Sequence, residues 1–361
     1  MAKKKVLFFV EAMGGGVFTY VTNLANGLSN DFDVYVAYAT RPQTPKDYKK
    51  YFNKNIHLIK VKNFKREISF SDIRAFFEMK KICKLVKPDI IHLHSSKAGL
   101  LGRFAFNGNN IPLFYTPHGY SFLMKNISPF RRKFYWLLEK VASLRHCTTI
   151  SCSYGENIET GKLTTSRLYV DNGINIKEID KALKGKTKKR GDSFTIFTIG
   201  RVSVQKNPSL FNKIASKFPN INFVWIGDGK LRKSLTEKNI KITGWLTSEE
   251  TLKRAANYDM FLLTSEWEGL PMSLLEAMYL KKVCVASNVI GNNNVIENGK
   301  NGYLCSNIRE YCSAINKVIE GNNAKIISAA YSDIINHYNS DKMATEYIKI
   351  YREAIKRRKT N

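Results

Sequence analysis

A nine-residue segment, EGLPMSLLE, combines two carboxylates with the predicted start of a helix. Glu268 opens the segment and Glu276 closes it, and carboxylates accept hydrogen bonds from hydroxyl groups such as those of a sugar. Pro271 suits the first position of a helix, so the backbone amides of Met272 and Ser273 are expected to point from the helix N-terminus toward a phosphate. A second interpretation stays open, in which the acids only complement the helix dipole.

Two cations lie in the segment GRVSVQKN, between a predicted strand at 194–199 and a helix that begins at Pro208. Arg201 can form two parallel hydrogen bonds with a diphosphate, and Lys206 adds a point charge. Such a pair can stabilise a nucleoside diphosphate as it leaves, a task that a divalent metal performs in many enzymes. The alternative is a solvated surface loop that binds nothing.

Three consecutive glycines, Gly14, Gly15 and Gly16, separate a predicted strand at 6–10 from a helical pattern that ends at Leu28. Glycine permits a positive φ and lets the backbone come close to a ligand. The run is neither the G-x-G-x-x-G motif nor a P-loop. A tight turn without a ligand explains it equally well.

Three histidines, His92, His94 and His118, fall at or just beyond the ends of predicted strands. No cysteine or carboxylate stands at the spacing that would complete a zinc site, so we predict no bound metal. His118, which Gly119 follows, is the best candidate for a polar group that faces a ligand. The sequence DFD at 31–33 could hold a metal-bound nucleotide, but its context predicts a solvated turn.

Strands and helices alternate along the chain. In the first half, apolar runs predict strands at 6–10, 34–37, 90–93, 113–115 and 148–150, with helices at 17–28, 72–87 and 129–144. In the second half they predict strands at 194–199, 223–226, 260–263 and 283–286, with a helix at 208–217. This alternation predicts two doubly wound α/β domains.

The domain boundaries follow from the same pattern. We predict an amino-terminal domain of residues 1–175, a carboxyl-terminal domain of residues 176–340 and a last helix at 341–361 that returns to the first domain. The charged stretch at 184–192 is expected to be exposed near the boundary. Open α/β sheets bind ligands at the carboxyl ends of their strands, so we expect the site in a cleft between the domains.

The composition limits the class of protein. The chain has 361 residues with 58 Lys and Arg against 30 Asp and Glu, a net charge of +28, which indicates an anionic partner. Its six cysteines form no Cys-x-x-Cys pair and are too sparse for a disulfide scaffold in a chain of this length, which favours a reducing compartment. The apolar run near the start is too short for a signal peptide, and no run approaches the length of a membrane span. We therefore expect a cytoplasmic protein whose membrane contact, if any, is peripheral.

The segment 120–145 mixes aromatic residues with lysines and arginines, as in FRRKFYWLLEK. Such a helix can dock on an anionic bilayer, where each basic residue adds about 1 kcal/mol. The alternative is an ordinary amphipathic helix whose charges are only solvated.

Taken together, these residues resemble the retaining glycosyltransferases of family 4, whose GT-B fold has two Rossmann-like domains facing a central cleft. The resemblance covers most of the chain and rests on GGGVFTYVTNLANGL, PDIIHLHSSKAGLLGR, TPHGY, VDNGI, GRVSVQKN, ITGWL, SEWEGLPMSLLEAM and VIGNNNVIENGKNGYL. The first half is similar to bacterial enzymes that make capsule, exopolysaccharide or O-antigen.

The resemblance implies a role for most of the candidate residues. Arg201 and Lys206 would hold the diphosphate of a nucleotide sugar, Gly15 and Gly16 would approach the phosphates from the other domain, and Glu276 would bind the ribose hydroxyls.

Two further residues would act at the donor sugar. Glu268 would contact the sugar, and His118 would touch it near the reacting carbon. The family keeps the anomeric configuration, by front-face attack without a metal or other cofactor, and a covalent intermediate on Glu268 is the alternative. Phe18 stands where many relatives carry glutamate, and Asp171 and Asn175 replace the commoner proline and aspartate.

The expected reaction moves a hexose or N-acetylhexosamine from a nucleotide sugar, with uridine as the base, to a lipid-linked oligosaccharide. One alternative is a nucleotide-sugar epimerase of the same fold, which would turn over without an acceptor. Another is a basic nucleic-acid-binding protein, but the sequence has no helix-turn-helix or aromatic stacking motif.

Overall fold

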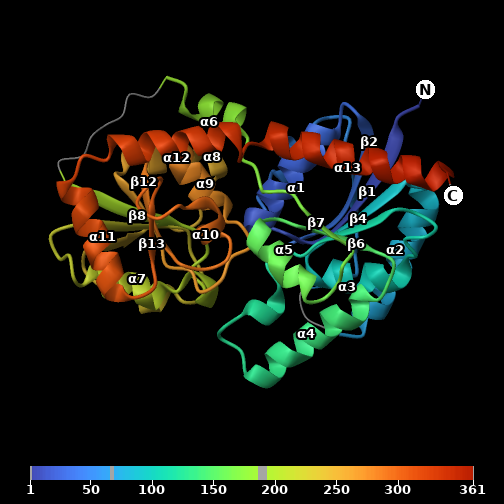
Figure 1. Cartoon of the computed structure of the whole chain (residues 1–361), viewed down its shortest axis with the longest axis horizontal. Helices are drawn as coiled ribbons and strands as arrows, with labels where there is room; N and C mark the ends of the chain where they lie inside the picture. The colour runs from blue at the N-terminus through green and yellow to red at the C-terminus, as the bar shows by residue number, and fades with distance from the viewer. Residues whose placement is uncertain (1, 66–68, 186–192, 361) are drawn as a thin grey trace. The chain divides into compact units, whose positions relative to one another are not determined.

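Figure 1 shows the computed structural model of the chain, which describes residues 2–65, 69–185 and 193–360. The chain forms two compact units, one of residues 1–172 with 340–361 and one of residues 173–339. The chain leaves the first unit three residues before the predicted boundary and returns at Ser340, one residue before the predicted start of the last helix. Of the charged stretch at 184–192, Lys184 and Gly185 are exposed and the rest lies outside the described residues.

The first unit is built on a seven-stranded parallel sheet with strand order β3-β2-β1-β4-β5-β6-β7. Its strands are β1 (Lys4–Met13), β2 (Phe32–Thr40), β3 (His57–Lys60), β4 (Ile90–His94), β5 (Leu113–Thr116), β6 (Thr148–Ser151) and β7 (Arg167–Tyr169). Its helices are α1 (Gly15–Leu28), α2 (Ser71–Val86), α3 (Ser96–Ala105), α4 (Pro129–Ser143), α5 (Tyr154–Gly161) and α13 (Ser340–Thr360), with 3₁₀ turns η1 (Tyr48–Tyr51) and η2 (Ser121–Leu123).

Both faces of this sheet are covered, which explains the continuous apolar run in β1. Alternate β1 side chains point to opposite faces, so Val6 and Phe8 join a core with α1 and α13, while Leu7 and Phe9 join a core with α2. Helices α2, α3 and α4 lie on the other side of the sheet from α1 and α13 (Figure 1).

The last helix, α13, is tied to the sheet by buried hydroxyl groups. The Tyr20 hydroxyl on α1 donates to that of Tyr347 at 2.5 Å, and the Tyr351 hydroxyl lies 2.5 Å from Nδ1 of His92 on β4. The carboxyl-terminal helix is therefore an integral layer of the first unit.

The second unit has a six-stranded parallel sheet with strand order β10-β9-β8-β11-β12-β13. Its strands are β8 (Thr195–Ile199), β9 (Asn222–Ile226), β10 (Ile240–Ile242), β11 (Met260–Leu263), β12 (Val283–Ser287) and β13 (Tyr303–Cys305). Its helices are α6 (Ile176–Leu183), α7 (Pro208–Ala215), α8 (Ser248–Asn257), α9 (Met272–Tyr279), α10 (Asn292–Val295), α11 (Ile308–Glu320) and α12 (Ala324–Asn336), with 3₁₀ turns η3 (Val204–Lys206) and η4 (Arg232–Ser234).

The prediction of two doubly wound, Rossmann-like α/β domains is confirmed. In each sheet the strand order reverses at one point, between β1 and β4 in the first unit and between β8 and β11 in the second. Ligands of such sheets bind beyond the carboxyl ends of the strands at this reversal, so these two places are where a site is expected. No helix within the described residues is long and apolar enough to span a bilayer.

Candidate functional site

In the second unit, the candidate residues lie on the two loops that follow β8 and β11. Arg201 and Lys206 are in the loop between β8 and α7, and Glu268 is in the loop between β11 and α9. Since β8 and β11 are neighbours in the sheet, their loops meet at the same edge. The structure thus brings together residues that are far apart in the sequence.

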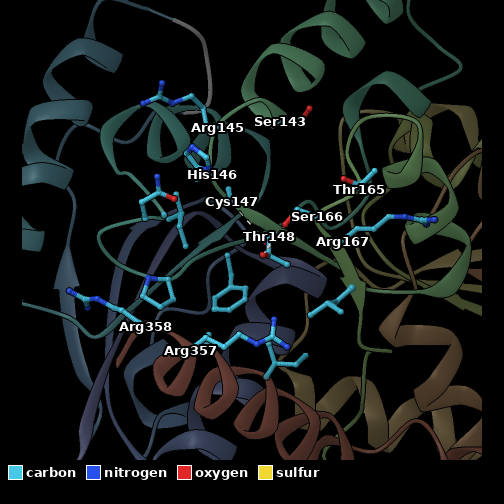
Figure 2. A pocket seen from close by; sticks show the side chains of 18 of the residues that line it. Ser143, Arg145, His146, Cys147, Thr148, Thr165, Ser166, Arg167, Arg357 and Arg358 are labelled. Atoms are coloured by element: carbon cyan, nitrogen blue, oxygen red, sulfur yellow. Dashed lines mark hydrogen bonds between the residues drawn. The ribbon is translucent and has the colours of Figure 1, made fainter. Parts of the chain in front are cut away.

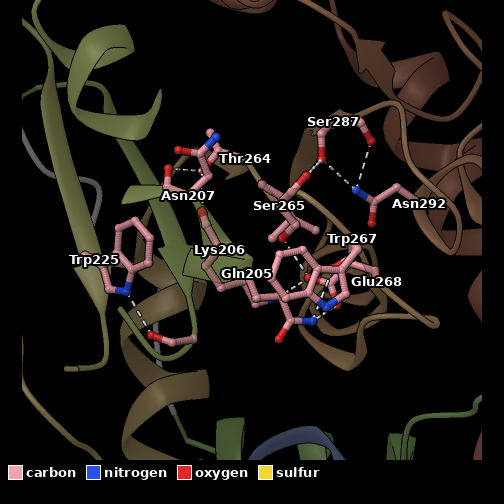
Figure 3. Close-up of polar contacts among 12 residues, drawn as sticks. Gln205, Lys206, Asn207, Trp225, Thr264, Ser265, Trp267, Glu268, Ser287 and Asn292 are labelled. Atoms are coloured by element: carbon pink, nitrogen blue, oxygen red, sulfur yellow. Dashed lines mark hydrogen bonds and ion pairs between the residues drawn. The ribbon is translucent and has the colours of Figure 1, made fainter. Parts of the chain in front are cut away.

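Glu268 and Lys206 form a buried ion pair, drawn in Figure 3. Lys206 Nζ donates to Glu268 Oε1 at 2.6 Å, and the Ser265 hydroxyl donates to the same oxygen at 2.6 Å. Gln205 Nε2 lies 3.3 Å from the other oxygen, Oε2, as a donor. An ammonium has three N–H donors, so Lys206 keeps donors for a second anion.

The two loops are also joined by hydrogen bonds to backbone carbonyls, which fix the positions of the charged side chains. The Glu266 amide donates to the Gln205 carbonyl at 2.8 Å, and the Thr264 hydroxyl donates to the Lys206 carbonyl at 2.8 Å. Asn207 then caps α7 by accepting from the Leu210 amide at 3.1 Å. The ion pair therefore sits on a preorganised frame.

Helix α9 begins one residue later than predicted. Pro271, expected at the first helical position, is instead the N-cap with extended backbone (φ −77°, ψ 121°), so Met272 is the first helical residue. Met272 and Ser273 still supply the first amides of the helix, and such amides have no acceptor within the helix. Both residues therefore stay at the start of the helix, as the sequence predicts.

Glu276 lies in the second turn of α9 and is mostly buried. Burial raises the pKa of its carboxyl from 4.5 to about 7. No hydrogen bond to this carboxyl compensates for burial within the described part of the chain. The group is suited to a ligand whose hydroxyls donate to it, because those bonds favour the charged form.

Arg201 is placed by a close packing of backbone around Gly200. The indole Nε1 of Trp225 on β9 donates to the Gly200 carbonyl at 2.8 Å. A Cβ on Gly227, whose φ is +137°, would lie only 2.2 Å from that same carbonyl oxygen. The strand ends can approach in this way only with glycine at this position.

In the first unit, His118 lies in a turn after β5 that has two residues in the left-handed region. His118 has φ 57° and Gly119 has φ 92°. The Gly119 amide donates to Oε1 of Glu156 at 2.6 Å, and the Cys152 amide donates to Oε2 at 2.8 Å. Glu156 is fully buried, and burial raises the pKa of its carboxyl. This carboxyl joins the ends of β5 and β6 and holds the histidine turn.

His118 is held as a neutral imidazole. Its Nε2 lies 3.2 Å from Nδ1 of His94, and the ring of Tyr20 packs edge-on at 4.5 Å between centroids. Burial lowers the pKa of His118 to about 3. His92, by contrast, bonds Tyr351 and Thr116 and thus supports the fold.

The glycine run starts α1, directly after β1. Gly15 has φ +56° and no atom within 4 Å of the position a Cβ would take, and Gly16 beside it is also exposed. Open space of this kind allows a ligand to approach the helix N-terminus. Gly15, Gly16 and His118 belong to the first unit, while the other candidates belong to the second.

Sequence reasoning did not single out three residues that shape the site. Gln205 and Ser265 complete the contacts of Glu268, and Glu156 fixes the turn of His118. Gln205 lies within the segment GRVSVQKN and Ser265 is the first residue of SEWEGLPMSLLEAM, so their places in these motifs could have identified both. Nothing around Glu156 in the sequence marks it.

A hollow of about 1210 Å³ in the first unit lies at the opposite, amino-terminal ends of β5, β6 and β7 (Figure 2). It is lined by Arg145, Arg167 and Arg358 among others, but Figure 2 shows these three guanidinium groups pointing in different directions. These three guanidinium groups therefore do not converge on one anion-binding site.

Within the described ranges no group of three or more His, Cys, Asp or Glu could hold a metal ion. In the DFD sequence, Asp31 pairs with Arg352 at 2.7 Å, and Asp33 accepts from Tyr35 at 3.0 Å. Phe18 on α1 packs edge-on against the ring of Tyr51.

Comparison with known proteins gives matches along most of the chain. Residues 14–163 match the family described as "Glycosyltransferase Family 4", and residues 180–333 match "Glycosyl transferases group 1". The UDP-Gal:alpha-D-GlcNAc-diphosphoundecaprenol alpha-1,3-galactosyltransferase of Escherichia coli is 28% identical over 336 residues, covering 83% of this chain and 85% of that protein.

Two further similarities are with a surface-polysaccharide enzyme and a solved structure. The capsular polysaccharide biosynthesis glycosyltransferase CapM of Staphylococcus aureus is 25% identical over 287 residues, covering 72% of this chain and 73% of that protein. The structure of HepE from Anabaena in complex with UDP and glucose aligns with a TM-score of 0.76 and 18% identity, over 95% of this chain and 98% of that one. This last likeness concerns the fold.

Proposed function

The chain belongs to glycosyltransferase family 4 and has the GT-B fold, and we propose that it is a hexosyltransferase. In the proposed reaction it moves a hexose or N-acetylhexosamine from a uridine-linked nucleotide sugar to a lipid-linked oligosaccharide. The product would be a bacterial surface polysaccharide. The observation that carries the proposal is the cluster after β8 and β11, where Lys206, Glu268 and the start of α9 lie on adjoining loops.

Each member of this cluster matches one part of the donor. The diphosphate is assigned to Arg201, to Lys206 and to the first amides of α9, because cations and helix N-termini both bind phosphate. The ribose hydroxyls are assigned to Glu276, whose raised pKa reflects burial without an offsetting hydrogen bond from the described residues. The donor sugar is assigned to Glu268.

In the proposed reaction the bond between the anomeric carbon and the diphosphate oxygen breaks, and a bond to the acceptor oxygen forms on the same face of the sugar. The acceptor proton goes to the departing diphosphate oxygen, and we propose that the reaction requires no metal or cofactor. Lys206 and Arg201 stabilise the charge that develops on the diphosphate. His118 is neutral, so it acts as a hydrogen-bonding group near the reacting carbon.

The names of two relatives support a lipid-linked acceptor. The Escherichia coli relative is named for an acceptor carried on diphosphoundecaprenol, and the Staphylococcus aureus relative for capsular polysaccharide. An acceptor of this kind is anchored in a bilayer, so we also propose that the protein works at the cytoplasmic membrane surface as a peripheral protein.

The test is calorimetric titration of the full chain with uridine diphosphate and with its galactose, glucose and N-acetylglucosamine conjugates. We expect Lys206→Ala and Glu276→Ala to weaken binding about tenfold or more, since each removes a charged or hydrogen-bonded contact. Lys213→Ala, at an exposed lysine on α7 of the same unit, is the matched control and should bind normally. Unchanged affinity in both site variants would contradict the assignment.

Turnover distinguishes the proposed reaction from epimerisation by the same fold. With the preferred donor, we expect sugar transfer only in the presence of a saccharide acceptor, in a buffer containing a chelator, and with the α-configured donor giving an α-linked product by NMR. Interconversion of the donor without an acceptor would instead support an epimerase.

A further inference from the structure

Helix α4 exposes an apolar stripe that the fold of the first unit does not cover. Phe130, Phe134, Leu137, Val141 and Leu144 are 80%, 47%, 53%, 44% and 75% exposed. Their spacing of three or four residues places them on one side of the helix. The opposite side is buried and includes Glu139 and Ala142. Contiguous exposed apolar surface of this kind marks an interaction site.

Further exposed apolar side chains lie on neighbouring helices of the same layer. On α2 and its N-cap, Phe70, Ile73 and Phe77 are 91%, 59% and 62% exposed, and Phe104 on α3 is 46% exposed. Helix α2 contacts α3, and α3 contacts α4. The outer surface of this layer, formed by α2, α3 and α4, is here called the helix-layer face (Figure 1).

The acidic residues of these helices are engaged in ion pairs or hydrogen bonds. Asp72 pairs with Lys97 at 2.7 Å, and Glu139 pairs with the buried Arg103 at 2.6 Å. Glu78 accepts hydrogen bonds from two backbone amides of the preceding loop. The exposed charges on and beside the helix-layer face are therefore basic: Arg74, Lys80, Lys81, Lys84, Lys87, Arg131, Arg132, Lys133 and Arg145.

A small hollow lies beside α4 and is large enough for a lipid headgroup. It has a volume of about 240 Å³ and is lined by Phe122, Pro129, Arg132, Lys133 and Trp136. Arg132 Nε donates to the Phe122 carbonyl at 3.2 Å, which leaves other guanidinium N–H groups for an anion. An indole beside two cations matches the boundary between lipid phosphates and acyl chains.

We propose that the helix-layer face docks on an anionic lipid bilayer, with the apolar stripes of α2 and α4 inserted among the acyl chains and the surrounding cations on lipid phosphates. The charge pattern selects this occupant, because the acids are paired or hydrogen-bonded while exposed cations and exposed apolar side chains lie on the same helices. The biological purpose of the contact rests on the proposed function, since a lipid-linked acceptor lies in the bilayer. The binding itself requires no acceptor.

The experiment is co-sedimentation of the full chain with vesicles of phosphatidylcholine alone or of phosphatidylcholine and phosphatidylglycerol in equal parts. We expect binding to the anionic vesicles, about tenfold weaker binding to the neutral ones, and weakening by salt. Phe134→Ser with Leu137→Ser, and separately Ile73→Ser with Phe77→Ser, should each lower binding about tenfold or more. Ile319→Ser with Ile335→Ser, at exposed isoleucines of the second unit, is the matched control and should bind normally.

Absence of binding by the unmodified chain would overturn the proposal, as would equal binding by the stripe variants and the control. Equal affinity for both kinds of vesicle would overturn the role of the cations. Self-association through the stripe, seen as a dimer that the stripe variants abolish while no vesicles are bound, would assign the face to a second copy of the chain and also overturn it.

Calorimetry with uridine diphosphate separates this proposal from the proposed function. The stripe variants should bind the nucleotide as the unmodified chain does, which also shows that they are folded. If the nucleotide fails to bind but the vesicles bind, the proposed function fails and the helix-layer face stands as a membrane surface.

Discussion

Replacing Glu276 by glutamine should stabilise the protein above neutral pH and at the same time weaken its binding of uridine diphosphate. The change keeps the shape of the side chain and removes its charge. The pKa of this carboxyl is raised from 4.5 to about 7 by burial, so the folded state binds the proton more tightly than the unfolded state does. The free energy of unfolding contributed by Glu276 therefore falls as the pH rises from about 4.5 to about 7.

The size of the effect follows from the shift. A rise from 4.5 to about 7 corresponds to about 3 kcal/mol at 1.36 kcal/mol for each pH unit. Because Glu276 is partly exposed, solvent screens some of this, and we expect about 2 kcal/mol. Glu276→Gln should match the unmodified chain below about pH 4.5 and exceed its stability by about 2 kcal/mol at about pH 8.

Urea unfolding followed by tryptophan fluorescence measures this difference. Three of the four tryptophans, Trp225, Trp245 and Trp267, lie in the second unit with Glu276, so the signal reports mainly on that unit. A stability difference that does not change with pH would refute the reasoning. Calorimetry supplies the second readout: the affinity ratio of unmodified chain to variant for uridine diphosphate should rise with pH through about 7, because ribose hydroxyls donate to the charged carboxylate.

Three further predictions concern other parts of the site. Lys206→Met leaves the buried Glu268 carboxylate without its cation and should cost about 3 kcal/mol of unfolding free energy. Adding Glu268→Gln to the same chain should restore most of this loss. If the double variant is no more stable than Lys206→Met alone, the ion pair does not have the role described. His118 should show no change in its NMR ring shifts between about pH 5 and pH 8, because burial holds its pKa to about 3, whereas a midpoint near the usual 6.5 would disprove that environment. Gly291→Ala puts a methyl group 2.5 Å from the Gly269 carbonyl oxygen, beside Glu268, and should lower both the melting temperature and the nucleotide affinity. Gly299 also has positive φ but has no atom within 4 Å of the added methyl group, so Gly299→Ala should cost only about 1 kcal/mol of unfolding free energy. Equal effects of the two variants would count against close packing at Gly291.

The central strands and the motif-bearing loops were predictable from the sequence, while the edges of the sheets were not. Long apolar runs such as those of β1 and β11 are strong signals because strands buried on both faces need them. The edge strands β3, β7 and β10 are three or four residues long and partly polar, so their pattern does not stand out. Helix α3, whose small residues Gly99 and Gly102 let it pack closely on Tyr115 and Leu93, was likewise not predicted.

The candidate site was likewise predictable from the sequence only in part. Lys206 and Glu268 could be found because each lies in a recognisable segment after a strand, and sheet topology explains why they meet. The roles of Glu156 and of the paired tyrosines Tyr20 and Tyr347 depend on contacts between distant parts of the chain. No local pattern specifies such contacts, because only the folded chain brings those side chains together.

The most direct test of the central claim is a crystal structure of the full chain with uridine diphosphate bound. We expect the diphosphate at Arg201, Lys206 and the first amides of α9, with the ribose hydroxyls on the Glu276 carboxylate. Uridine diphosphate bound away from the loops after β8 and β11, or no binding at concentrations that saturate other nucleotide-sugar enzymes, would contradict it.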